Sequence, residues 1–453
     1  MDIDALKQAA IDAYMRSEGY QRQGGGSYFD YGLGFSATVG SDGTGVATYS
    51  TSSGSGMPVT SNVDLDYRTE WGEVRDRVDT ALEQWQDDRL PEPSALNGGM
   101  VTAQAAVTAL NMGSQNSYGG ALGGYYKTIS DNASEFRGAA MDAFNNSFVN
   151  QLPAVISNHG CLAAIVTEAW AAEKEIWTQA RADRDTHVEK ATAALDSYAE
   201  SEGTSEIKFL LGLTGAALAG ASAIASGGVT LPFALATAGI TSLSATNDYV
   251  GELRLERSGD SYQDLMAAFE SGLDDIDEAI TQQETLVREG LENGWQTFEA
   301  HRALFDLTPR VSDDGDGGWG DETSIFDVTD AGALAVVIPG EAVVGSLSSG
   351  MKNLAHGLED ADPQIIAGAE EGGLLSPSAR EVGLRYNGVA IMMWIVGDNT
   401  AASIRDLTWD VRNSEAMLRA IVTDFTNADA ASQAGLDDLR GQLVGGSGED
   451  PWL

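Results

Sequence analysis

Few residues in this chain have the types and spacing that chemistry requires. The four histidines, His159, His187, His301 and His356, lie too far apart in the sequence to form a pair at the spacing of metal ligands. The first three fall on or next to apolar stripes of predicted long helices, where a hydrogen-bonded core imidazole is the simpler interpretation. The HExxH, GxSxG and phosphate-loop motifs are absent from the sequence. We therefore predict a protein that is not an enzyme and that uses no metal and no cofactor.

The remaining candidates for chemistry are weak. Cys161 is the single cysteine, so it can form neither an internal disulfide nor a thiolate metal cluster, and its apolar neighbours favour core packing. Residues 313–316 (Asp-Asp-Gly-Asp) lack the alternating register and the closing glutamate of a calcium loop. Residues 32–37 match a degenerate dinucleotide fingerprint, but no apolar strand precedes them and no helix pattern follows.

The chain is strongly acidic. Its 453 residues include 68 Asp and Glu against 26 Lys and Arg, a formal net charge of −42. We expect no binding to nucleic acid, because such binding needs basic side chains aligned on the phosphates. Binding to anionic membrane surfaces is disfavoured for the same reason. The first residues include Asp2 and Asp4 and no apolar h-region. We expect either leaderless export to the medium or cell envelope, or a cytoplasmic protein.

The N-terminal part, residues 1–60, combines a predicted amphipathic helix over 1–20 with an arm rich in Gly, Ser and Tyr. Residues 35–49 alternate around Asp42-Gly43 well enough for a short β-hairpin, and a flexible arm is the rival interpretation. Helices are then predicted from Val63 to just before Pro91, and over 94–111.

Two long amphipathic helices dominate the segment 61–307. Apolar or small residues recur at helical spacing from Pro153 to Tyr198 and again from Tyr262 to Phe305. Each stripe needs a partner helix, and two stripes of similar length can cover one another. We predict an all-α fold, an elongated antiparallel bundle built on these helices.

Between the two helices, residues 209–247 carry no charge. The turn at 227–232 divides them into two apolar segments, which predicts a helical hairpin at one end of the rod. The hairpin is either buried by this chain or a sister subunit, or inserted into a membrane as a tip or a span. Candidate membrane or oligomer contacts are Phe209, Leu210, Leu211, Gly212, Ala216, Gly220, Leu231, Pro232 and Phe233.

The C-terminal part begins with an acidic, glycine-rich linker at 308–330. Within a predicted C-terminal helical domain over 331–445, residues 334–358 are a small-residue helical or mixed segment. From residue 376, helical periodicity predicts one or two long helices in a compact C-terminal hairpin. Residues 446–453 form a predicted flexible tail.

The order of these elements resembles a known family. The stretches 90–93 (LPEP), 139–144 (AAMDAF), 152–153 (LP) and 171–177 (AAEKEIW) resemble the helical secreted substrates of actinobacterial type VII (ESX) secretion, the EspA and EspB group. Residues 374–440 are similar to the small helical-hairpin EspC-type substrates. The family's Trp-x-Gly turn is missing, whereas its Tyr-x-x-x-Asp/Glu export signal occurs at Tyr14/Glu18 and, better placed at a helix end, at Tyr198/Glu202.

The resemblance implies leaderless export, a helical-bundle fold, partner helices and a structural or membrane-facing role. Our leading hypothesis is therefore a secreted, non-enzymatic helical protein that acts by assembly, as a homo-oligomer or with a helical secretion partner. One alternative is an α-helical pore-forming or toxin-delivery protein that inserts residues 209–247 into a bilayer. A further alternative is a cytoplasmic or phage structural scaffold.

Overall fold

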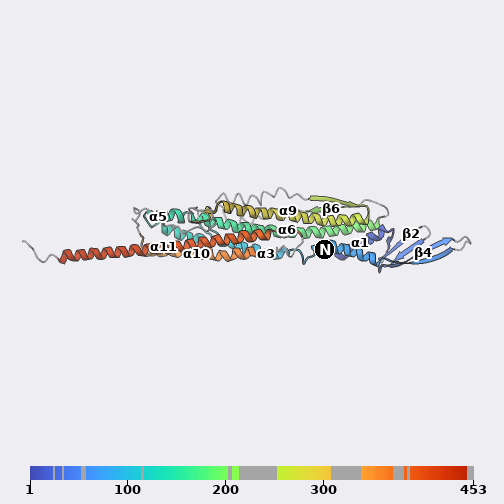
Figure 1. Ribbon diagram of the computed structural model, residues 1–453, viewed down its shortest axis with the longest axis horizontal. Helices are drawn as coiled ribbons and strands as arrows, with labels where there is room; N and C mark the ends of the chain where they lie inside the picture. Colours follow the sequence, from blue (N-terminus) through green and yellow to red (C-terminus); the bar gives the residue numbers. More distant parts are fainter. Residues whose placement is uncertain are drawn as a thin grey trace, which may run out of the picture.

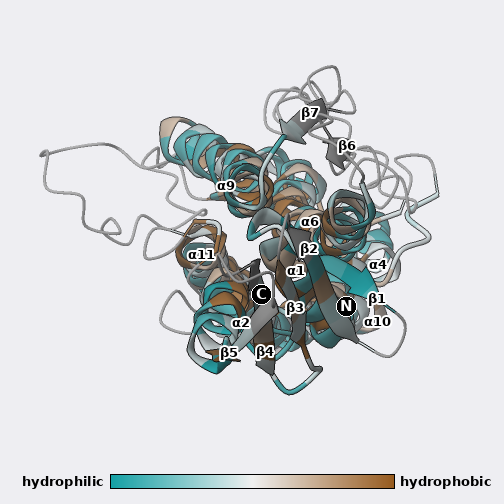
Figure 2. Cartoon of the chain, turned by 90° about the vertical axis from the view of Figure 1, so that its right-hand side faces the viewer, coloured by the Kyte–Doolittle hydropathy of each residue, from teal (hydrophilic) through white to brown (hydrophobic). Residues whose placement is uncertain are grey.

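The computed structural model describes residues 1–23, 26–32, 35–52, 58–113, 117–201, 207–213, 253–307, 338–370, 382–384 and 388–445. The molecule is elongated and mostly helical, with a β-sheet at one end and a single helix projecting from the other (Figure 1). Figure 2 looks along the long axis from the sheet end and shows the helices gathered behind the sheet.

The helices are α1 (Ile3–Ser17), α2 (Arg68–Leu82), α3 (Pro93–Ala109), α4 (Gly123–Ala133), α5 (Ala139–Phe144), α6 (Leu152–Glu200), α9 (Tyr262–Ala300), α10 (Glu341–Glu370) and α11 (Val389–Gly445). Short turns are the 3-10 helices η1 (Glu83–Trp85) and η5 (Arg302–Leu304) and the π-helical η2 (Asn145–Val149). The strands are β1 (Gln21–Gln23), β2 (Ser27–Gly32), β3 (Phe35–Val39), β4 (Thr44–Ser52), β5 (Pro58–Asp66), β6 (Ile207–Leu213) and β7 (Leu253–Gly259).

Helix α6 is the centre of the molecule. Every residue from Leu162 to Trp170 is buried, which is the pattern of a helix covered on all sides. Its neighbours include α1, α3, α9 and α11. Helix α9 runs antiparallel to it, since Gly272 lies against His187 and Gly294 against Ile165. The prediction that two long helices cover one another is confirmed.

A histidine and a glycine fix the crossing of α6 and α9. The ring of His187 stacks on Phe269 and its Nε2 lies 2.8 Å from the Phe269 carbonyl oxygen. Because a carbonyl only accepts, Nε2 carries the proton in this bond. A Cβ atom at Gly272 would lie 2.3 Å from Cε1 of that ring, so only glycine lets α9 approach closely enough.

The N-terminal sheet is an antiparallel meander in the order β1-β2-β3-β4-β5. Its β3–β4 hairpin is the one predicted over residues 35–49, and Gly43 (φ 82°) makes its turn. Tyr28 holds the sheet to α1 by donating a 2.5 Å hydrogen bond to the buried carboxylate of Asp12, and its ring packs edge-on against Trp71.

This sheet corrects two predictions. The chain is mostly helical, as predicted, but the five-stranded sheet means that it is not purely all-α. Val63 and Leu65 lie in β5, not in the helix predicted to begin there, since α2 starts only at Arg68. The physical reason is pairing: β5 forms a ladder with β4, opposite Ala47 and Gly45, and such ladders between distant residues leave little trace in the local pattern.

The start of the uncharged segment is also not helical. Phe209, Leu210, Leu211 and Gly212 lie in β6, which pairs antiparallel with β7 so that Leu211 faces Leu255. A short apolar run is compatible with either a strand or a buried helix. Here the run is a strand because it pairs with a second strand some forty residues later. The helical hairpin predicted over 209–247 is therefore wrong for residues 209–213. Residues 214–247, with the predicted turn at 227–232, lie outside the described residues.

At the other end, α10 and α11 form an antiparallel pair, in which Arg412 bonds Glu359 and Arg405 lies 3.9 Å from Asp362. The hairpin predicted after residue 376 is wrong, because residues 389–440 belong to one helix; α11 pairs instead with α10, within the predicted C-terminal helical region 331–445. The pair also packs on the body, where the Trp170 indole donates a 2.9 Å hydrogen bond to the Gly368 carbonyl. The linker 308–330 and the tail 446–453 lie outside the described residues.

The close approach at Gly272 predicts that Gly272→Ala destabilises the protein. Alanine is the better helix former, yet its methyl group would overlap the His187 ring, and such overpacking costs about 1–3 kcal/mol. Urea unfolding followed by circular dichroism measures the effect. The control is Gly345→Ala on α10, where an added Cβ meets nothing within 4 Å, so its midpoint should stay or rise. Equal midpoints for the two variants would contradict the proposed crossing.

Candidate functional site

The most distinctive surface is the free end of α11. Every residue from Thr426 to Arg440 is exposed, and Figure 1 shows this part of the helix projecting beyond its neighbours at the end opposite the sheet. Leu436 is 65 % and Leu439 55 % exposed, more than any other large apolar side chain in the described part of the chain apart from Val101. We call residues Thr426–Arg440 the arm.

The arm continues the packing stripe of the body. Along the buried part of α11, the inward residues follow alternating steps of three and four, and they are Ala401, Ile404, Thr408, Val411, Glu415 and Leu418. The same steps lead onward to Val422, Phe425, Asp429, Ser432, Leu436 and Leu439, which we call the seam. Such a repeat is the spacing of a coiled coil. Val422 still packs on the body, and from Thr426 the repeat extends past the last partner helix.

A polar network at the edge of the core fixes the base of the arm. The Glu415 carboxylate is 8 % exposed and accepts hydrogen bonds from the Ser348 hydroxyl of α10 and from Arg419. Arg419 also donates to the Ser348 hydroxyl oxygen at 2.9 Å. Because all three side chains are bonded to one another, the direction in which α11 leaves the body is set by charge-assisted bonds.

An isolated helix of this length is marginally stable in water, and exposed leucines on it leave apolar surface hydrated. Leu436 and Leu439 are exposed on one side of a helix that has lost its partners, and a second helix packed there would bury both. The arm is therefore the candidate functional site, and its chemistry is that of helix-to-helix binding.

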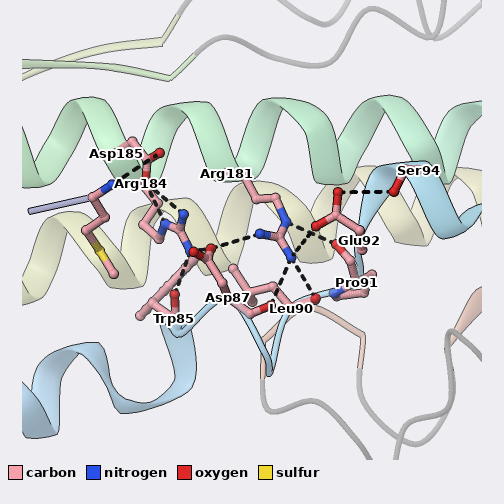
Figure 3. Close-up of polar contacts among 10 residues, drawn as sticks. Trp85, Asp87, Leu90, Pro91, Glu92, Ser94, Arg181, Arg184 and Asp185 are labelled. Carbon is pink, nitrogen blue, oxygen red and sulfur yellow. Dashed lines mark hydrogen bonds and ion pairs between the residues drawn. The ribbon is translucent and has the colours of Figure 1, made fainter.

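Two arginines of α6 hold the connection between α2 and α3 (Figure 3). Arg184, with a side chain only 3 % exposed, donates to the Trp85 carbonyl at 2.7 Å and to the Asp87 carboxylate at 2.8 Å. Arg181 donates to the carbonyls of Leu90 and Pro91, at 2.9 Å and 3.1 Å. Both guanidinium groups are used by backbone and carboxylate oxygens, so this cluster ties three elements together.

One serine–histidine pair has the composition of a catalytic dyad. His159 Nδ1 lies 2.8 Å from the Val155 carbonyl and Nε2 lies 2.8 Å from the Ser403 hydroxyl, which therefore donates its proton to Nε2. Burial lowers the pKa of His159 to about 4. A general base works best with a pKa near the operating pH, and Ser403 is 4 % exposed. The hydrogen bond between these two side chains links α6 to α11, and the pair is poorly suited to nucleophilic catalysis.

A buried carboxyl lies further along α6. Glu168 is 2 % exposed, its Oε1 has no hydrogen-bond partner in the described part of the chain, and burial raises its pKa to about 7. Burial also raises the pKa of the nearby Cys161 thiol to about 12, and the Glu168 charge adds to this. The thiol donates to the Ser157 carbonyl of its own helix. At neutral pH this cysteine is therefore an inert thiol, as a core residue would be.

The structure describes only some of the residues singled out from the sequence. Tyr198 is buried in the last turns of α6, whereas Glu202 lies outside the described residues, so the export signal stays a prediction. Phe209, Leu210, Leu211 and Gly212 are in β6. Ala216, Gly220, Leu231, Pro232 and Phe233 lie outside the described ranges, and the proposed contact roles stay predictions.

The sequence did contain the signal for the arm. Leu418, Val422, Phe425, Leu436 and Leu439 follow a helical period, and that period predicted a helix. It could not distinguish a stripe that packs inside a hairpin from one that has no partner, because both need the same residues.

Comparison with known proteins gives no match: no protein family, no curated protein and no solved structure is similar to this chain. Among the helices of the described ranges, none has both the length and the hydropathy needed to cross a membrane. Within those ranges, no three His, Cys, Asp or Glu side chains are grouped so that they could hold a metal ion.

The buried Glu168 predicts a pH dependence of stability. Its pKa rises from the ordinary value of 4.5 to about 7 on folding, so between these values the folded chain keeps a proton that the unfolded chain has lost. Stability therefore falls as the pH rises through this window, by up to roughly 3 kcal/mol. Glu168→Gln removes the effect: the variant should be the more stable protein at pH 8 and equal to the parent near pH 4.5.

Urea unfolding of both proteins at pH 4.5 and pH 8 measures this difference. Glu175→Gln, at an exposed position of the same helix, changes the net charge equally and serves as the control. A Glu168→Gln variant that is no more stable than the parent at pH 8 would show that the carboxyl is ionised at little cost.

Proposed function

We propose that this protein is a non-enzymatic helical protein, exported by a leaderless type VII route, that acts by assembly through helix packing. The single observation that carries the assembly role is the arm, an exposed helix whose seam continues the packing stripe of the body. The export route rests on the resemblance of the sequence to type VII substrates.

The interior of the molecule supports the non-enzymatic part of the proposal. Arg184, His187, His159 and Glu415 each bond to a group on a different element, and each bond holds two helices or a helix and a turn together. Polar groups arranged in this way stabilise one packing of the helices. The overall charge of −42 adds a strongly hydrated, self-repelling surface, which favours a soluble protein in the medium.

Fractionation of the producing cells tests the export. We expect the chain in the envelope and the medium of cells with an intact type VII system, and its loss from both when that system is inactivated. Tyr198→Phe together with Glu202→Gln should reduce export, whereas Tyr14→Phe with Glu18→Gln, the other match to the signal, should not. A chain that stays entirely in the cytosol would contradict export and favour the scaffold alternative.

Native electrophoresis of the fraction that contains the protein tests the assembly. The wild-type chain should migrate in a complex larger than its own 47.6 kDa, and the double variant Leu436→Asp, Leu439→Asp should migrate alone. An identical complex in the variant would remove the arm from the proposed function.

A second candidate function is insertion of the uncharged segment into a bilayer, and the absence of charge over residues 209–247 favours it. Leakage of a dye from liposomes made of neutral lipids, on addition of the purified protein, would support this function. Intact liposomes over the full concentration range would exclude it.

A further inference from the structure

The seam points to its own partner. We propose, on the basis of the proposed assembly function, that the arm binds the arm of a second copy of this chain, antiparallel, in a two-fold symmetric dimer. The occupant follows from the order of polar and apolar residues in the seam, which is self-complementary in one orientation only.

The seam has polar residues in its middle and apolar residues on both sides. Asp429 and Ser432 lie between Val422 and Phe425 on one side and Leu436 and Leu439 on the other. In an antiparallel pair whose two-fold axis lies midway between positions 429 and 432, Asp429 meets the partner's Ser432. The same register places Phe425 against the partner's Leu436, and Val422 against the partner's Leu439.

Every layer of this register is chemically matched. The Ser432 hydroxyl can donate to the partner's Asp429 carboxylate, and the two-fold axis repeats the bond. The four outer layers bury the exposed side chains of Leu436 and Leu439 in both copies. A parallel pair would instead place Asp429 beside the partner's Asp429, in a layer where like charges are desolvated together. The position of Asp429 in the seam therefore favours the antiparallel orientation.

The residues that flank the seam allow a close approach. Ala428 and Gly435 lie beside it at the positions that face one another across an antiparallel pair, and both are small. Arg440 comes next to the partner's Arg419, whose charge is already bonded to Glu415 of its own helix. The paired stretch, Val422 to Leu439, is about 26 Å long.

The shape of the molecule permits this dimer. Each arm projects from the end of the body opposite the sheet, so two copies would lie on opposite sides of the paired arms without overlap of their bodies (Figure 1). The seam is also continuous with the stripe through which α11 packs on α10, so the dimer extends an interface that already exists.

The mass of the purified full-length chain tests the proposal. Light scattering during gel filtration, over a dilution series in about 0.15 M salt to screen the net charge, should give twice 47.6 kDa at high concentration. The variant Leu436→Asp, Leu439→Asp should give the single-chain mass, with dimerisation weakened at least a hundredfold. These side chains are exposed, so its circular dichroism should match the parent.

A matched control separates the seam from charge alone. Ala430→Asp with Ala434→Asp adds the same two charges to the arm on the face opposite the seam, and this variant should stay dimeric. A parent that is monomeric at every concentration, or a seam variant that is still dimeric, overturns the inference. If the purified chain is monomeric while the complex in cell fractions still requires the seam, another protein is the partner and the proposed function stands.

Cysteine crosslinking tests the orientation in a Cys161→Ala background. Two differently tagged chains, one with Phe425→Cys and one with Leu436→Cys, should form a mixed disulfide when combined under mild oxidation. Leu436→Cys alone should form none, because the antiparallel register separates these positions by about 16 Å along the axis. A strong disulfide of Leu436→Cys with itself would show a parallel pair and overturn the proposed register.

Discussion

The fold of this molecule depends on one long helix that must be covered on every side. Helix α6 is buried without a break from Leu162 to Trp170, and a helix of that kind is stable only inside a sheath of other helices. Helices α1, α3, α9 and α11 supply the sheath. Directional groups then select one arrangement among the many that would cover the apolar surface: the His187 ring fits beside Gly272, and the Trp170 indole bonds the Gly368 carbonyl. Burial supplies the driving force, and these few contacts supply the geometry.

The sequence predicted the parts of the fold that depend on local periodicity. The pattern from Pro153 to Tyr198 could belong to nothing but a long helix, and its length implied a partner of similar length. The sheet was largely missed, because the ladder that makes β5 a strand joins it to β4, and this pairing does not show in the local pattern of β5 itself. The prediction for residues 207–213 was wrong for the same reason. Their apolar run is equally compatible with the start of a helix, and only the pairing with β7 shows that it is a strand.

The candidate site shows a different limit. The residues of the seam were visible as helical spacing, and the residues of the export signal were visible as a motif, but neither pattern states what lies opposite. Leu436 faces solvent, and this follows only from where α10 and its neighbours end. For His159 and Ser403 the structure brings together two residues far apart in the chain, and a pair of this kind cannot be read from spacing. A single sequence thus predicts the helix that carries a site residue, but not the residues that lie against it.

The outer strand of the N-terminal sheet has a consequence for the behaviour of the protein at high concentration. Strand β5 pairs with β4 on one side only, and residues Thr60–Asp64 are exposed. An open strand of this kind is a template on which further strands add, the first step toward fibrils. Here the open strand carries Asp64 and Asp66 beside Val63 and Leu65, so a second such strand would bring carboxylates close together. Repulsion between these carboxylates opposes the addition of a second molecule at this edge of the sheet.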